Sequence, residues 1–354
     1  MKLPRITILA TLLLTAPAAA QLQITPPVAT PSAVPEKQKP KPPPAAKKKE
    51  AAPAPKPSAS PKPALPATVI PAPATDNPNV DLVFGAYQRG QYKTAFDLAT
   101  ARAQAGDPKA MTMLGELYSN AMGIRRDYAK ALEWYKRASD AGDREAMFAL
   151  AMLRISGRGG SVDKSEAVKL MASAAKLGEP KAAYNLALLY LDGQTLPQDV
   201  KRSAELLRQA ADAGLPEAQY ALATFYKEGT GVPKDPERAV RLLQAASLAD
   251  NVDAEVEYAI AMFNGTGTVK NQPAAVALLR KASRQGSAIA QNRLAWVLIN
   301  GMGTSVDKVE GFKWHLVAKT SGKGDPELDK QLSDLPAEDR GKAEAAARKW
   351  LGTK

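Results

Sequence analysis

The amino-acid sequence predicts an all-α fold, an α-solenoid of helix-loop-helix repeats, preceded by a disordered linker. Three observations predict it. Residues 105–320 consist of six 36-residue units without an insertion or deletion. Positions 6 and 34 of the unit are alanine in all six copies, and position 23 is aspartate or asparagine in all six. A unit this small cannot bury its own apolar face, so we expect neighbouring units to stack and helical caps to close both ends.

Residues 1–20 are typical of a secretory signal peptide. Lys2 and Arg5 precede an apolar run over 6–14, and small residues follow up to Ala20. The run is shorter than the roughly 20 residues that span a bilayer. We expect cleavage after Ala20 and a periplasmic or secreted protein without a transmembrane span; an uncleaved anchor is the alternative.

Residues 21–79 differ in composition from the rest, with 17 prolines and 8 lysines. Such a segment buries too little apolar area to offset the entropy of ordering, so we expect a disordered, partly polyproline-II linker. It is either a plain spacer or an arm that contacts cell wall or lipid through its lysines. The formal net charge is +12, but residues 1–79 carry +7 of it, which argues against a nucleic-acid partner.

The first helix of each unit is predicted from position 4, where three copies have proline, a residue suited to the first helical turn. Its apolar face follows at positions 6, 10 and 14. Position 11 is small throughout, glycine at Gly115 and alanine elsewhere, which indicates close packing against the partner helix. Glycines at positions 17 and 19 end this helix in most copies.

The second helix is predicted to begin after position 23, because aspartate and asparagine are strong N-caps. Glu166 and Glu310 complete capping boxes in two copies. Its core face runs through positions 27, 30 and 34. Glycine at position 2 of the following unit supplies a left-handed C-cap in most copies.

This pattern resembles the Sel1-like repeat, a relative of the tetratricopeptide repeat. The resemblance covers residues 105–320 and implies an adaptor or scaffold, often secreted or periplasmic in bacteria. The fifth copy departs most, with Asp250 for glycine, Tyr258 for leucine and Met262 for tyrosine. Residues 80–104 resemble a tetratricopeptide-like cap, and residues 321–354 are predicted to form a C-terminal helical cap.

Catalytic signatures are nearly absent. The chain has no cysteine and one histidine, which excludes cysteine–histidine nucleophile pairs and the usual zinc sites. His315 occupies a core position of the sixth unit, so we expect it to be packed. The glycines at 157, 159 and 160 suggest a phosphate loop, but glycines recur there with the repeat. We therefore expect no cofactor and no metal.

A binding surface is predicted where apolar residues do not follow the core pattern. Positions 5, 8, 12 and 15 of the first helices are expected to line a concave face, and an exposed apolar stripe there would mark a partner site. The alternative is burial between repeats, and Phe263 and Trp296 are the favoured functional residues. The candidates are Phe148, Met152, Tyr184, Leu188, Tyr220, Ile260, Phe263 and Trp296.

These observations favour a non-catalytic periplasmic scaffold that binds a protein or peptide partner, and the resemblance to bacterial Sel1-type proteins implies a role in envelope signalling. A second hypothesis is a protein that binds or hydrolyses cell-wall peptidoglycan. A third makes the proline- and lysine-rich arm the active part. Capture of a stoichiometric protein partner would support the first, and retention of muropeptides the second.

Overall fold

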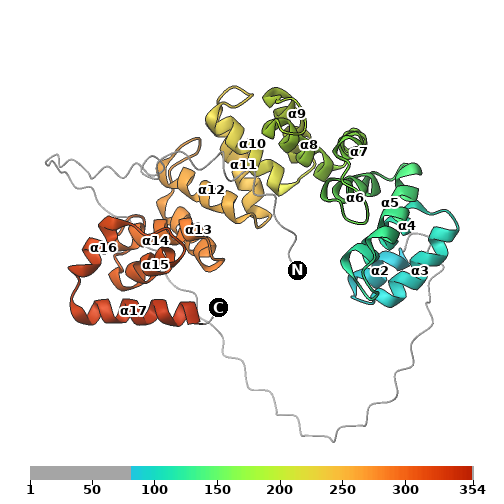
Figure 1. Cartoon of the computed structure of the whole chain (residues 1–354). Helices are drawn as coiled ribbons and strands as arrows, with labels where there is room; N and C mark the ends of the chain where they lie inside the picture. Colours follow the sequence, from blue (N-terminus) through green and yellow to red (C-terminus); the bar gives the residue numbers. More distant parts are fainter. Residues whose placement is uncertain (1–80, 353–354) are drawn as a thin grey trace, which may run out of the picture. The chain divides into compact units, whose positions relative to one another are not determined.

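The computed structural model describes residues 81–352, which form sixteen helices, α2–α17 (Figure 1). The predicted signal peptide and linker over residues 1–79 lie outside the described residues. The first helices of the six repeats are α4 (Pro108–Asn120), α6 (Arg144–Ser156), α8 (Pro180–Asp192), α10 (Pro216–Glu228), α12 (Val252–Asn264) and α14 (Ala288–Asn300). The second helices are α5 (Tyr128–Asp140), α7 (Lys164–Lys176), α9 (Val200–Asp212), α11 (Pro236–Leu248), α13 (Gln272–Arg284) and α15 (Lys308–Thr320).

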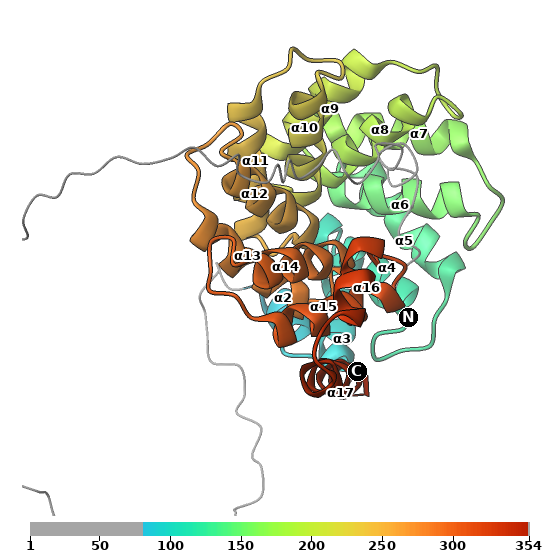
Figure 2. The same cartoon turned by 90° about the vertical axis from the view of Figure 1, so that its left-hand side faces the viewer.

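Both predicted caps are helical. The N-terminal cap consists of α2 (Leu82–Gln88) and α3 (Tyr92–Gln104), and the C-terminal cap of α16 (Pro326–Ser333) and α17 (Ala337–Gly352). From α2 to α15 each helix contacts the next one in the chain, and α17 packs on α15, so the packing is local along the sequence (Figure 2). No helix within residues 81–352 has the length and apolar composition needed to cross a bilayer.

The helix ends confirm the capping pattern. At position 23 of each repeat the aspartate or asparagine side chain accepts a backbone N–H three residues on, as Asp199 does from Arg202 at 2.9 Å. The position-2 glycines have φ between +84° and +95°. Asp250 replaces one of them and keeps a left-handed φ of 58°, which is uncommon for a residue with a side chain. The fifth repeat therefore keeps the backbone of the others.

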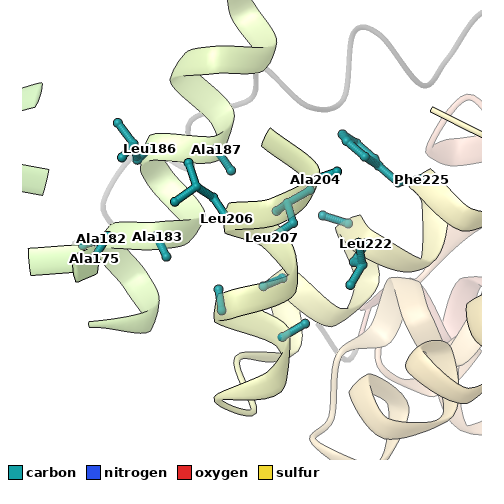
Figure 3. Packing of buried hydrophobic residues seen from close by; sticks show 14 of the residues in the cluster. Ala175, Ala182, Ala183, Leu186, Ala187, Ala204, Leu206, Leu207, Leu222 and Phe225 are labelled. Atoms are coloured by element: carbon teal, nitrogen blue, oxygen red, sulfur yellow. The ribbon is translucent and has the colours of Figure 1, made fainter. Parts of the chain in front are cut away.

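The core is built from alanine and leucine of successive repeats (Figure 3). All six alanines at position 34 have 0% exposure. Gly115 explains the small residue at position 11, because a Cβ there would lie 2.6 Å from the ring of Tyr135. On the second helices, position 31 is buried in every repeat, whereas position 30 is only half-buried in four. Position 31 therefore lies deeper in the core than the predicted position 30.

An ionisable side chain occupies a core position of the fifth repeat. Glu255 on α12 is fully buried, and its carboxylate lies 3.3 Å from Lys281 Nζ, which also contacts Asp250 at 3.1 Å. The equivalent residues are glutamine in the two neighbouring repeats, where Gln219 donates to Ala211 O and Gln291 to Ser283 O. A carboxylate cannot donate such a bond. Burial of the carboxylate raises the pKa of Glu255 from its ordinary value of 4.5, although the nearby Lys281 ammonium lowers it.

Glu255→Gln is expected to stabilise the fold above pH 5 and to reduce its pH dependence. Because the folded-state pKa of Glu255 is raised, the wild-type protein loses stability as pH rises above 4.5, where the unfolded state gives up this proton first. Glutamine does not ionise and restores a buried hydrogen bond worth about 1 kcal/mol. Urea unfolding between pH 4 and 8 should show that the difference in free energy of unfolding between the variant and the wild type grows with pH. Glu237→Gln, at an exposed site, is the control. A difference between Glu255→Gln and wild type that stays constant with pH would contradict the expectation.

Candidate binding surface

Six of the eight predicted binding residues are partly accessible. Phe148, Met152, Tyr184, Leu188, Tyr220 and Trp296 are half-buried. In repeats 2–4 they are joined by two similar side chains, Ile155 on α6 and Leu191 on α8. We call this set the first-helix stripe, and it consists of Phe148, Met152, Ile155, Tyr184, Leu188, Leu191 and Tyr220. Most of its members pack one side against the core, which fixes their positions and leaves the other side open.

The expectation of an exposed patch in repeats 5 and 6 is wrong. Ile260 and Phe263 are only 8% and 6% exposed. The physical reason is a wider buried arc, since α12 buries positions 8, 12 and 15 together, whereas α6 leaves all three half-buried. Trp296 is engaged by the C-terminal cap, because its indole N–H donates to Asp325 at 2.9 Å. Of the two favoured residues, Phe263 is a core residue and Trp296 is held by a structural contact.

A small apolar pocket of about 180 Å³ opens on the first-helix stripe between repeats 2 and 3. Met152 and Ile155 of α6 form one wall, and Leu188 and Leu189 of α8 form the other. Polar and charged residues also line the pocket: Lys164, Asn185, Asp192, Gln194 and Thr195. An apolar hollow with a few polar groups is the usual form of a site that accepts a side chain or small ligand. Two of the predicted binding residues, Met152 and Leu188, meet here.

The loop sequence explains why the pocket opens at this junction. In five repeats a glycine at position 19 lies against the preceding helix pair; a Cβ on Gly231, for example, would be 2.7 Å from Val200 O. The third repeat alone has another residue there, Thr195. A side chain cannot approach the neighbouring backbone as closely as glycine. Thr195 and Lys164 are the equivalents of Gly231 and Val200 at this junction, and both line the pocket.

Carboxylates of the following repeat act on the two tyrosines of the stripe. Burial raises the pKa of Tyr184, and the Glu217 carboxylate of the next repeat raises it further. Burial likewise raises the pKa of Tyr220, with added effects from Glu257 and Asp253. Each tyrosine ring therefore lies near negative charge from the following repeat and stays protonated at physiological pH. The pattern combines apolar area with hydroxyl groups and acidic neighbours.

His315 is packed, as predicted. It has 0% exposure, and its Nε2 lies 2.9 Å from Asp329 Oδ1, an oxygen that also accepts from Lys319 at 2.7 Å. Within residues 81–352 no cluster of histidine and carboxylate side chains has the geometry of a metal site. The histidine joins the last repeat to the C-terminal cap, which gives it a structural role.

Sequence reasoning missed the pocket and the acidic neighbours. The signal for the pocket was present, because Thr195 is the only departure from glycine at position 19. The signal for the acidic neighbours was the charge at position 5 of the next repeat, Glu217 and Asp253. Both signals come from residues that vary between the repeats rather than from the residues that recur in them.

Comparison with known proteins decides the family. The Sel1 repeat model matches six consecutive segments, 108–143, 144–179, 180–215, 216–251, 252–287 and 288–322. These segments cover more than half of the chain. The chain belongs to the Sel1-repeat family. Each matched Sel1 unit begins at the first residue of a first helix, three residues after the start used in the sequence pattern. Sel1-repeat proteins are generally non-catalytic scaffolds for protein interaction.

Two solved structures are similar to this Sel1-repeat chain. One is c5321, a protective antigen in uropathogenic Escherichia coli strains with an SLR fold, at 25% identity and a TM-score of 0.65. That match covers 76% of this chain and 59% of c5321, so this chain spans less than two thirds of its length. The other is a Sel1 repeat protein from Oxalobacter formigenes, at 27% identity and a TM-score of 0.61, covering 69% of this chain and 100% of that one. No curated protein sequence matches the chain.

Proposed function

We propose that this chain is a non-catalytic scaffold that binds a protein or peptide partner on the first-helix stripe of repeats 2–4. The observation that carries the proposal is the apolar pocket between α6 and α8, which lies within a row of half-buried apolar and aromatic residues. Rigid helices hold these side chains, so a partner would meet a largely preformed surface. Aromatic residues in such rows often supply most of the binding energy.

The proposed location is the periplasm or the extracellular space. It rests on the sequence of residues 1–20, with their basic start, apolar run and small residues before Ala20. The sequence has no cysteine, so an exported form would depend on repeat packing rather than on disulfides. Residues 21–79 would then separate the repeats from the point of export or attachment.

Photocrosslinking in intact cells of the source organism tests the proposal. A benzophenone amino acid placed at Tyr184 should give a covalent product with one protein partner, because the ring position lies in the stripe. The same amino acid at Lys201, on the exposed side of α9, is the control and should give none. Equal products from both positions would contradict the proposal. Recovery of muropeptides in place of a protein would favour a cell-wall function.

A further inference from the structure

The second helices are basic throughout the repeats, whereas the first helices are acidic in two of them. In the six second helices Lys and Arg outnumber Asp and Glu by 17 to 7, and each of these helices is positive. In the first helices α10 and α12 the ratio reverses, with one basic residue against four acidic ones that are at least partly exposed; a fifth, Glu255, is buried. The chain as a whole has a formal net charge of +12. A negative first-helix surface on a basic protein is therefore a local feature of repeats 4 and 5.

Two of the three carboxylates that raise the pKa values of these tyrosines are exposed and, within the described part of the chain, unpaired. Glu217 and Asp253 are exposed, and neither has an ion-pair partner among the residues that the structure describes. Glu257 is already paired, because the Lys227 Nζ lies 3.0 Å from its carboxylate. Exposed carboxylates beside half-buried tyrosine rings suit ammonium and guanidinium groups, which interact with both the charge and the ring face.

The apolar pocket adds a second requirement. It lies one helical turn further along α8 from Tyr184, at Leu188, and Asp192 stands at its edge. Its volume of about 180 Å³ accommodates a single apolar side chain rather than a folded surface. A ligand that meets both features must carry positive charge and an apolar anchor, and it must extend from the pocket between repeats 2 and 3 to the carboxylates of repeats 4 and 5.

We infer that the partner presents a basic peptide segment, whose lysine or arginine side chains contact Glu217 and Asp253 and whose apolar side chain enters the pocket between α6 and α8. This inference rests on the proposed function and names the chemistry of the partner. Complementary charge steers association and sets specificity, and the buried apolar anchor slows dissociation. An acidic segment would meet like charge at Glu217 and Asp253 and is disfavoured.

Fluorescence anisotropy with defined peptides tests the inference on the full-length protein. Three labelled peptides of equal length are used: one of lysine, proline and leucine, one with glutamate in place of lysine, and one with serine in place of leucine. The lysine–leucine peptide should bind most tightly, and its affinity should fall as salt rises because exposed charges are screened. Equal binding of the lysine and glutamate peptides would overturn the inference.

Charge-matched variants locate the contact. Glu217→Gln with Asp253→Asn should weaken the lysine–leucine peptide about fivefold, as expected for two exposed charge pairs. Glu133→Gln with Asp212→Asn makes the same change in net charge on second helices and should leave affinity unchanged; both residues are exposed. Equal weakening by both pairs would mean a general effect of net charge and would overturn the inference.

Two outcomes separate this inference from the proposed function. If Tyr184 crosslinks to a partner while the lysine–leucine peptide fails to bind, the scaffold function stands and the basic-peptide inference falls. If sedimentation shows self-association that the Glu217 and Asp253 variants abolish, the occupant is a second copy, presenting its positive second helices. That result would also overturn the inference of a separate partner.

Discussion

Replacing Gly231 by alanine is expected to destabilise the repeats by about 2–4 kcal/mol. Gly231 has a φ of +66°, and a Cβ would lie 2.7 Å from Val200 O in the preceding repeat. A left-handed conformation costs a residue with a side chain roughly 1–2 kcal/mol. The contact with a backbone oxygen adds a cost similar to overpacking, since neither group has a flexible end that could move. Thermal and urea unfolding would measure the loss.

Gly214→Ala is the matched control for Gly231→Ala. Gly214 also has a positive φ, +85°, but nothing lies within 4 Å of the position its Cβ would take. This variant should therefore lose only about 1–2 kcal/mol of stability, which is the cost of the left-handed backbone conformation. The difference between the two variants isolates the contact between repeats. Equal losses would show that the close approach of the loop contributes nothing to stability.

Ala174→Leu is expected to destabilise the protein by about 1–3 kcal/mol through overpacking. Ala174 is at position 34 of the second repeat and has 0% exposure, in a core where side chains already fill the space. Ala172→Leu, two residues earlier on α7, is the same change at an exposed site and should alter stability little. Similar unfolding midpoints for both variants would show that the assigned core face of α7 is wrong.

The repeat pattern was enough to predict the fold, because the same local rules act six times. Aspartate at position 23 caps a helix wherever it occurs, and alanine at position 34 permits one interhelical distance. Even where the sequence departs, at Asp250, the backbone keeps the left-handed conformation. Helix bounds and most of the core therefore followed from propensity, capping and periodicity, although position 31 rather than the predicted position 30 lies deepest on the second helices.

The exposure of the first helices could not be predicted in the same way. Phe148 and Phe263 both look like surface residues of an amphipathic helix, yet one is half-buried and the other is 6% exposed. The difference depends on how wide an arc each first helix buries, which is a property of packing between repeats. Likewise the contact of Trp296 with Asp325 depends on where the C-terminal cap docks.

Binding measured for two double variants tests the central claim most directly, using the partner identified by crosslinking at Tyr184. Tyr184→Ser with Tyr220→Ser changes the stripe of repeats 2–4, and Phe263→Ser with Trp296→Ser changes the positions that the structure assigns to packing. Loss of the buried Phe263 ring alone should cost about 3–5 kcal/mol.

The first variant should keep cooperative unfolding and lose partner affinity at least tenfold, since aromatic anchors often contribute about 2 kcal/mol or more. The second should unfold at a much lower temperature, and its remaining folded fraction should bind the partner normally. The opposite result would contradict the claim: wild-type affinity in the first variant, together with lost binding and unchanged stability in the second.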